Sequence, residues 1–210
     1  MNSERQNNRC RPTNAVGTAV RLCIAADIER YSRFTNLEAE RAQERFVHVL
    51  RYARIQAGLT EDEVDAQHSG DGQFLVLPPG LDESTAIPAF VRALSLAMRQ
   101  INADVNRHVR LRLRLAMHRG LLMPGANGWV GTAAIAVHRL LDSASLRAAL
   151  ADSPVATFGL AVGDSLYRDV IQHGYPGLTS TSFHRTVVNI PKKMFTEPAW
   201  IYLDRARGDT

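Results

Sequence analysis

The sequence predicts a mixed α/β fold of the α+β class, with a ferredoxin-like βαββαβ core followed by a C-terminal α/β extension. Segments with strand-like apolar patterns alternate with two long segments of helical period. Up to residue 118 they follow one another as strand, helix, strand, strand, helix and strand. Further helices and strands come after this core, so the extension is expected at its carboxyl side.

Composition is consistent with one domain. At 210 residues and 45% hydrophobic content the chain can bury one full-sized core, expected over residues 18–204. Residues 1–17 have no apolar period and are expected to form a flexible leader, and residues 205–210 a tail. The two cysteines are too few for a disulfide framework.

The sequence gives weak indications of where the protein is located and what it binds. No apolar run approaches the length of a membrane span and no signal peptide is recognisable, so we expect a cytoplasmic protein that does not enter a membrane. The net charge of +4 comes from arginine. Arginine-rich composition alone is a weak pointer to nucleic acid, and we expect no nucleic-acid partner.

The first strand and helix follow from two patterns. A nearly continuous apolar run over residues 20–26 predicts a buried central strand that delivers Asp27 at its carboxyl end. Thr35 and Glu38 have the spacing of a capping box, and the apolar residues that follow recur at helical intervals until Gly58. A long amphipathic helix is therefore expected to pack back on the sheet.

The next elements complete the core. Residues 64–77 predict two strands joined by a glycine turn. Residues 87–105 have a helical period, with Pro88 in the first turn. Residues 109–117 alternate between apolar side chains and others, which marks a strand with one buried face. Its three arginines, Arg110, Arg112 and Arg114, are expected to face solvent or a partner.

The extension begins after an expected loop over residues 123–128. Residues 132–149 are helical in pattern, with a break near Asp142 or Ser143. A strand over residues 156–162 and a helix over residues 164–172 follow. Two final segments, 187–190 and 199–203, predict a terminal pair of strands.

Two acids are the candidates for chemistry. Asp27 ends the first strand and Asp71 lies in the hairpin, and these elements are neighbours in such a core, so the acids can converge. Magnesium takes one or two carboxylates and fills its other positions with phosphate oxygens and water. Gly70 and Gly72 let a phosphate approach closely. Taken singly, each acid is better explained as a turn or cap residue, and only the two together favour a metal site.

Four short segments resemble the class III adenylyl and guanylyl cyclase catalytic domains, in an order that covers residues 18–204. They match the family's first metal segment, its metal hairpin, its strand ending in His-x-Gly, and its glycine-then-helix segment. In chain order they are Asp27-Ile28 with Tyr31-Ser32, Ser69-Gly-Asp-Gly72, Leu115-Ala-Met-His-Arg-Gly120, and Trp129-Val-Gly131 with Arg139-Leu140.

The resemblance implies a set of site residues. Two Mg²⁺ or Mn²⁺ ions would be held by Asp27 and Asp71, with Ile28 in the same metal segment. Catalytic roles would belong to Arg139 and to Lys193 or its neighbour Lys192. Residues at substrate-binding positions of the family are Ile28, Tyr31, Ser32, Gln67, Gly70, Gly72 and Gly131.

The resemblance also implies a reaction and an assembly. The family works as head-to-tail dimers with composite sites, so a homodimer is expected. The ribose 3′ hydroxyl of a nucleoside triphosphate attacks the α-phosphate, and the products are a 3′,5′-cyclic nucleoside monophosphate and pyrophosphate. Arg139 of the other protomer would stabilise charge on the phosphoryl group in the transition state.

Three positions depart from the family pattern. Ile135 stands where the family has an asparagine, Gln67 where it has the lysine that reads a purine, and Gly128 or Trp129 where a polar base-reader is expected. Ile135 cannot hydrogen-bond a ribose oxygen, which disfavours adenylyl or guanylyl cyclase activity of the usual kind. Loss of the purine-reading lysine implies altered base selectivity, as in bacterial anti-phage cyclases that make cyclic pyrimidine nucleotides, and hence a role in antiviral defence.

Two alternatives stay open beside an active cyclase. One is a catalytically impaired pseudo-cyclase that acts as a nucleotide-binding or protein-interaction signalling module. The other is a ferredoxin-like RNA-binding domain, which would need aromatic side chains on the open sheet face. The strand over residues 109–117 has none, which disfavours the RNA-binding alternative.

Overall fold

A mixed sheet forms the centre of the protein, whose computed structural model describes residues 17–205. The strand order is β2-β3-β1-β4-β6-β8-β7, with β5 paired to β4. All pairs are antiparallel except that of β4 with β6. The expected α+β class is confirmed. Of the expected tail over residues 205–210, Arg205 belongs to the last strand and the other residues lie outside the described ones, as do all but the last residue of the expected leader.

The elements have the following bounds. The strands are β1 (Ala19–Ile28), β2 (Asp65–Ser69), β3 (Gly72–Val76), β4 (Leu113–Gly125), β5 (Gly128–Val130), β6 (Ala156–Gly163), β7 (Phe183–Ile190) and β8 (Phe195–Arg205). The helices are α1 (Asn36–Gln56), α2 (Glu83–Asn102), α3 (Thr132–Leu141), α4 (Ala144–Ala151) and α5 (Asp164–Asp169).

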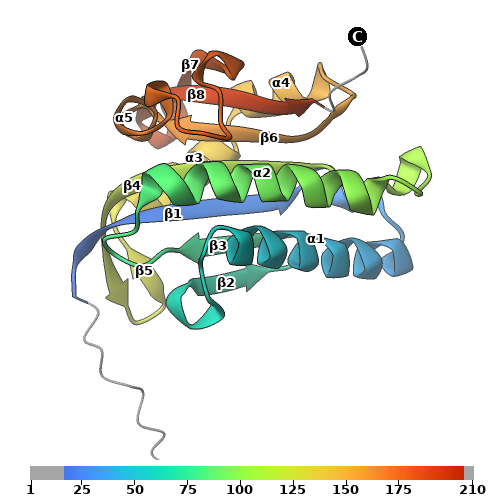
Figure 1. Ribbon diagram of the computed structural model, residues 1–210, viewed down its shortest axis with the longest axis horizontal. Coiled ribbons are helices and arrows are strands. Elements are labelled where there is room, and N and C mark those ends of the chain that lie inside the picture. The colour runs from blue at the N-terminus through green and yellow to red at the C-terminus, as the bar shows by residue number, and fades with distance from the viewer. Residues whose placement is uncertain (1–16, 206–210) are drawn as a thin grey trace, which may run out of the picture.

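Both faces of the central sheet are covered. The helices α1 and α2 lie side by side across one face (Figure 1), over a core that includes Leu22, Ile24 and Leu115. On the other face α3 covers Cys23 and Ala25, which alternate with the first set along β1, and α4 packs on β6 and β8. Because both faces are buried, β1 has the nearly continuous apolar run that predicted it.

The predicted start of α1 is confirmed. The backbone N–H and the hydroxyl of Thr35 both donate to Glu38 Oε2, each at 2.9 Å, and satisfy a capping box. The break predicted near Asp142 is also observed, because Ser143 accepts from Leu146 N and caps the start of α4.

The helix α2 begins earlier than expected, which corrects the predicted place of Pro88. Asp82 Oδ1 accepts hydrogen bonds from the backbone N–H groups of Ser84 and Thr85, so the helix starts at Glu83. Pro88 therefore lies inside the helix and beyond its first turn. The Asp82 cap satisfies backbone donors of the first turn, whereas Pro88, which has no N–H, leaves one intrahelical hydrogen bond unmade.

The strand β4 begins later and ends later than predicted. Residues 107–109 form a 3₁₀ turn, and the side chain of Asn102 bonds both the N–H and the carbonyl of Leu111 at 2.8 Å. Leu111 is thus buried without belonging to a strand. The expected loop over residues 123–128 is instead part of an arm in which β4 continues to Gly125 and pairs with β5.

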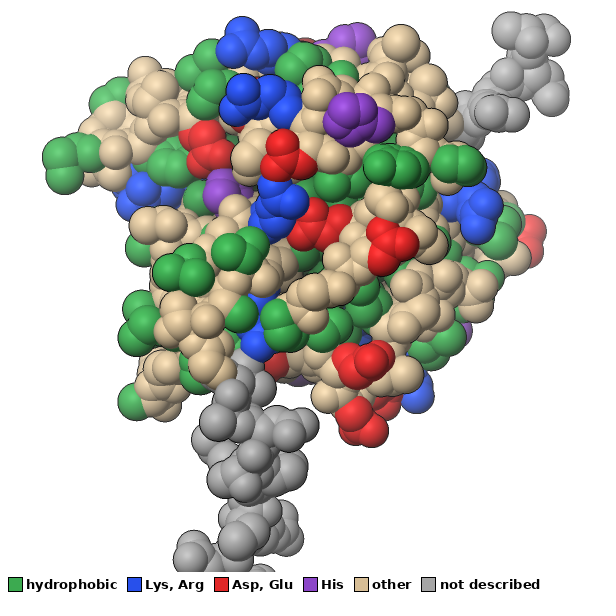
Figure 2. Space-filling view, turned by 60° about the vertical axis from the view of Figure 1, so that its left-hand side comes forward, with side chains coloured by type: hydrophobic (Ala, Val, Ile, Leu, Met, Phe, Trp, Pro, Cys, Tyr) green, Lys and Arg blue, Asp and Glu red, His purple; other side chains and the backbone are tan. Residues whose placement is uncertain are grey.

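The surface visible in Figure 2 mixes hydrophobic, acidic and basic side chains, with no region of a single charge sign. Among residues 17–205, no helix combines the length and the hydrophobicity that crossing a bilayer requires.

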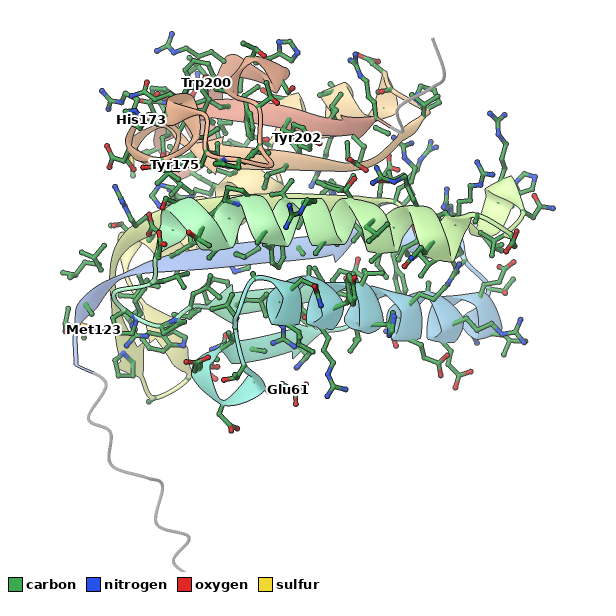
Figure 3. All side chains as sticks on the ribbon, in the orientation of Figure 1. Glu61, Met123, His173, Tyr175, Trp200 and Tyr202 are labelled. Atoms are coloured by element: carbon green, nitrogen blue, oxygen red, sulfur yellow. The ribbon has the colours of Figure 1, made fainter. Side chains whose placement is uncertain are left out.

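The part of the molecule formed by β8 and α5 is rich in aromatic contacts, and there Tyr167 stacks on Trp200 with ring centroids 3.6 Å apart. Figure 3 shows Trp200 and Tyr202 in this part, near His173 and Tyr175.

The start of α3 depends on a glycine, and we expect Gly131→Ala to destabilise the fold. Gly131 has φ 153°, and a Cβ there would lie 2.3 Å from the carbonyl oxygen of Leu121. Overpacking and a disfavoured φ together predict a loss of about 3 kcal/mol in the free energy of unfolding. Urea denaturation measures it. Gly17→Ala, where a Cβ meets nothing within 4 Å, is the control and should change stability by less than about 0.5 kcal/mol. Equal effects would contradict the close approach.

Candidate active site

The two candidate acids lie on neighbouring segments. Asp27 is paired across the sheet with Gly72, and the backbone N–H of Ile28 donates to the carbonyl oxygen of Asp71 at 3.0 Å. A Cβ at position 72 would lie 3.2 Å from the Ala26 carbonyl oxygen, so glycine is what lets the hairpin approach β1. The end of β1 and the turn between β2 and β3 therefore form one site.

The turn that bears Asp71 is held in place by α1. Gly70 adopts a left-handed conformation with φ 53°, and its carbonyl accepts a hydrogen bond from Gln43 Nε2 at 3.0 Å. Asp71 itself is half-buried. The glycines that flank the acid thus have a conformational role and a close-packing role, as the hairpin pattern indicates.

Asp27 is engaged by an arginine from the opposite strand. Arg114 lies directly across from it on β4 and donates from Nε to Oδ1 at 2.8 Å and from Nη2 to Oδ2 at 2.5 Å. Each side chain is 14% exposed. This is the bidentate geometry in which an arginine binds a carboxylate most strongly.

Opposing effects act on the pKa of the Asp27 carboxyl group. Burial raises the pKa of this group, and the hydrogen bonds and charge of Arg114 lower it in part. The negative charges of Asp71 and Asp142 raise the same pKa further. Crowded acids of this kind favour a bound cation, because a cation removes their mutual repulsion.

The expectation that Arg112 and Arg114 face solvent or a partner is wrong. Arg112 pairs with Glu29 at 3.2 Å and donates to carbonyl oxygens at the end of α4, including Leu150 and Ser153. The alternating pattern correctly placed both arginines opposite the leucines. However, β1 ends in acids and α4 ends in unpaired carbonyls on that side, so the guanidinium groups are drawn inward.

A hollow of about 510 Å³ lies beside this pair of strands. Its lining residues include a single acid, Glu29, and four arginines, Arg30, Arg112, Arg114 and Arg147. Sequence reasoning missed all four. The signal that could have found two of them is the run of arginines on the strand that pairs with the acid-bearing strand. Guanidinium groups gathered in this way suit a polyphosphate.

Two further predicted residues lie in the turn after β1. Tyr31 and Ser32 belong to the 3₁₀ turn Tyr31–Arg33, which connects β1 to α1. Tyr31 packs edge-on against Phe34 with ring centroids 6.3 Å apart, and Ser32 is exposed. The structure thus places Ser32, rather than Tyr31, at the surface of this segment.

The positions expected to read the base lie together where the β4–β5 arm meets β2. Gln67 on β2 touches Gly128, where a Cβ would lie 2.7 Å from Gln67 Nε2. Trp129 donates from Nε1 to Asp65 at 3.0 Å, and Arg21 lies 4.8 Å above its ring. These contacts fold the β4–β5 arm onto β2.

The remaining predicted residues lie elsewhere in the chain. Gly131 precedes α3, and Arg139 lies on α3 with its guanidinium 5.0 Å from the ring centroid of Phe195. Lys193 is exposed in the turn before Phe195. The pairing of β6 with β8 puts Phe195 at the end of the sheet opposite Asp27. Within one chain Arg139 and Lys193 therefore contact or adjoin Phe195, and not the acids.

The residues at the site fit a magnesium or manganese ion that is shared with a phosphate. No group of three or more acidic, histidine or cysteine side chains gathers into a metal cluster among residues 17–205. Asp27 and Asp71 offer two carboxylates, and Mg²⁺ completes its octahedron with phosphate oxygens and water. Arg114 occupies one lone pair on each oxygen of Asp27, so a metal bound by Asp27 would use the remaining lone pairs or displace one of these hydrogen bonds.

No protein-family model and no curated protein sequence matches this chain. Among solved structures, a bacterial light-regulated adenylyl cyclase is similar over 90% of this chain and 93% of that one, with a TM-score of 0.62 and 12% identity. The adenylate/guanylate cyclase/hydrolase from Silicibacter pomeroyi gives 0.60 and 19% identity, over 88% of this chain and 96% of its own. The chain has the fold of a class III nucleotide cyclase catalytic domain.

A third similar structure of this cyclase fold contains a nucleotide. The guanylate cyclase domain from Catenaria anguillulae in complex with GTP matches 90% of this chain and 98% of its own, with a TM-score of 0.54 and 14% identity. The resemblance and the fold predicted from the sequence are confirmed by these matches. The low identity makes this a divergent cyclase-like chain.

We expect Arg114→Ala to make the stability of this cyclase-like domain depend more strongly on pH. Loss of one partner of a buried ion pair should lower the free energy of unfolding by about 3 kcal/mol at pH 7. Because burial already raises the pKa of Asp27, its contribution to stability is full below the unfolded-state pKa and is lost as pH rises through the folded-state pKa. Removal of Arg114 raises that pKa further, so the deficit should grow with rising pH and nearly vanish in acid.

Urea denaturation between pH 3 and pH 8 measures this difference. Arg92→Ala is the matched control, since Arg92 is exposed on α2 and should change stability by less than about 0.5 kcal/mol at every pH. Parallel pH profiles for Arg114→Ala and the unmodified protein would contradict a role for Arg114 in holding the Asp27 carboxylate.

Proposed function

We propose that this protein is a divergent nucleotide cyclase that converts a nucleoside triphosphate to a 3′,5′-cyclic nucleoside monophosphate and pyrophosphate. One observation carries the proposal: Asp27 and Asp71 lie on adjoining segments, and Arg114, which pairs with Asp27, lines a hollow together with three other arginines. That combination matches a substrate that combines polyphosphate with divalent cations. The nucleotide cyclase fold supports the same conclusion.

The chain's own residues suggest how the triphosphate is held. Arg114 can exchange the Asp27 carboxylate for a phosphate, because both present paired oxygens to its planar fork. Arg30 and Arg147 line the same hollow and can neutralise the remaining charge. Gly70 and Gly72 leave the backbone of the metal hairpin accessible. Two divalent ions on Asp27 and Asp71 would polarise the phosphoryl oxygens and activate the ribose 3′ hydroxyl.

The reaction needs a second copy of the chain. Arg139 and Lys193 are placed at Phe195 rather than at the acids, so they can complete a site only from another protomer. Exposed apolar side chains on the β4–β5 arm and α3 offer a self-complementary surface for a two-fold dimer. They are Leu121, Met123 (Figure 3), Val130 and Ile135, each between 46% and 56% exposed.

Base selectivity is proposed to differ from that of adenylyl and guanylyl cyclases. Ile135 is exposed and cannot hydrogen-bond a ribose oxygen. The side chain of Gln67 lies beside Gly128. It can present either a donor or an acceptor to a base, so a pyrimidine is compatible with this position. Replacement of the purine-binding lysine of the family by Gln67 changes which bases the site binds and which it rejects.

The second candidate is a pseudo-cyclase that binds nucleotide without turnover. Two observations favour it: the isoleucine at position 135, and the bidentate pair that engages both oxygens of Asp27. The two candidates share the same binding site and differ only in product formation.

An assay with each of the four ribonucleoside triphosphates and Mg²⁺ or Mn²⁺, with detection by mass spectrometry, separates them. We expect a cyclic monophosphate from one triphosphate, and a rate at least about 100-fold lower for Asp71→Asn, since the divalent ions that Asp71 would hold stabilise negative charge in the transition state. Asp62→Asn, at an exposed acid outside the site, is the matched control and should keep full activity.

Other outcomes of this assay are equally informative. Metal-dependent binding that raises the melting temperature without any product would favour the pseudo-cyclase. The absence of both product and metal-dependent binding would contradict either form of the proposal.

Composite sites predict complementation between two inactive variants. Asp71→Asn and Arg139→Ala should each be inactive alone, whereas their mixture should regain up to about a quarter of normal activity, because half of the dimers then contain one intact site of two. Activity of the mixture is measured after exchange of subunits. No recovery, with dimers shown by light scattering, would contradict sites shared between protomers.

A further inference from the structure

A second arginine-lined hollow, of about 480 Å³, lies outside the acidic site. It opens where α2 ends, beside the 3₁₀ turn Arg107–Val109 and the start of β6. Five arginines line it, and no acidic side chain does. These arginines are Arg33, Arg99, Arg107, Arg110 and Arg112.

The positive charge in this hollow is poorly compensated. Within residues 17–205, only Arg112 of the five lies within 4.0 Å of a carboxylate, that of Glu29. Burial lowers the pKa of Arg112, the charge of Glu29 raises it in part, and the neighbouring charges of Arg33 and Arg30 lower it again. The mixed charges of the face in Figure 2 contrast with this concentration of one sign. An anion would relieve the repulsion.

Two of the guanidinium groups are already held in position. Arg33 donates to the carbonyl oxygen of Arg110 at 2.7 Å. Arg99 donates to Ser95 Oγ at 2.7 Å, and Ser95 in turn donates to the buried Asp204 at 2.6 Å. Side chains that are fixed before binding lose little entropy when a ligand arrives, so the arrangement is favourable for binding.

One wall of the hollow is apolar. Leu111, Pro154 and Val155 line it, and Val155 is 63% exposed although it is hydrophobic. An inorganic anion would leave this wall in contact with water. An anion that carries an apolar or aromatic group would cover it and gain from the burial.

We propose that this hollow binds a small organic phosphate, with the phosphate among the arginines and the organic group against Pro154 and Val155. Arg112 lines both this hollow and the one beside Asp27. A ligand that attracts Arg112 would compete with Glu29, next to the metal segment, so on the proposed function its binding would be coupled to that of the triphosphate.

Isothermal titration calorimetry with phenyl phosphate and with inorganic phosphate tests the proposal. EDTA in the buffer removes divalent metal, so that metal-dependent binding at Asp27 and Asp71 does not contribute. We expect one site per chain, with phenyl phosphate bound at least about tenfold more tightly than inorganic phosphate because of the apolar wall. Equal affinities, or no saturable binding of phenyl phosphate, would overturn the proposal.

Variants locate the binding. Arg107→Ala combined with Arg110→Ala should weaken phenyl phosphate binding at least about tenfold. Arg30→Ala, at a residue that lines only the hollow beside Asp27, and Arg92→Ala, on the surface of α2, should each change the affinity less than about twofold. Binding lost with Arg30→Ala but retained in the double variant would place the anion in the other hollow and overturn the proposal. A melting curve of each variant checks that it is folded.

Discussion

Asp27 and Arg114 face each other across the β1–β4 ladder, and most of what this site can do depends on that pairing. Without the arginine, a half-buried carboxylate close to Asp71 would be protonated or would destabilise the fold. With the arginine, the ionised carboxylate of Asp27 is stabilised, and a bound phosphate can replace that carboxylate as the partner of Arg114. The ion pair therefore serves stability in the free protein and provides a guanidinium for the substrate.

The sheet concentrates arginines where β1 ends and β4 begins. One hollow there combines them with a single acid, Glu29, and the other combines them with an apolar wall. Arg112 belongs to both and also caps α4, so the two hollows share one structural element. Charge of one sign gathered at the end of a sheet costs stability, which is consistent with a region built for binding anions.

Local patterns predicted the elements well, because capping, periodicity and glycine turns act within a few residues. The capping box at Thr35 and the hairpin around Asp71 are examples. Contacts made across the chain were not predictable in this way. Arg114 was expected to face solvent because alternation indicates the face of a strand on which a residue lies and not what lies opposite that face. Pro88 was expected in the first turn because the cap at Asp82, which starts the helix earlier, was not predicted. Arg139 was recognised only through a resemblance, since its proposed partners lie in another protomer.

A crystal structure with Mn²⁺ and a non-hydrolysable nucleoside triphosphate tests the central claim most directly. The account requires anomalous manganese density within coordination distance of Asp27 and Asp71, and an Arg114 guanidinium that has moved from the Asp27 carboxylate to a phosphate oxygen. An unchanged Asp27–Arg114 pair, with the triphosphate bound elsewhere or without metal at the acids, would contradict it.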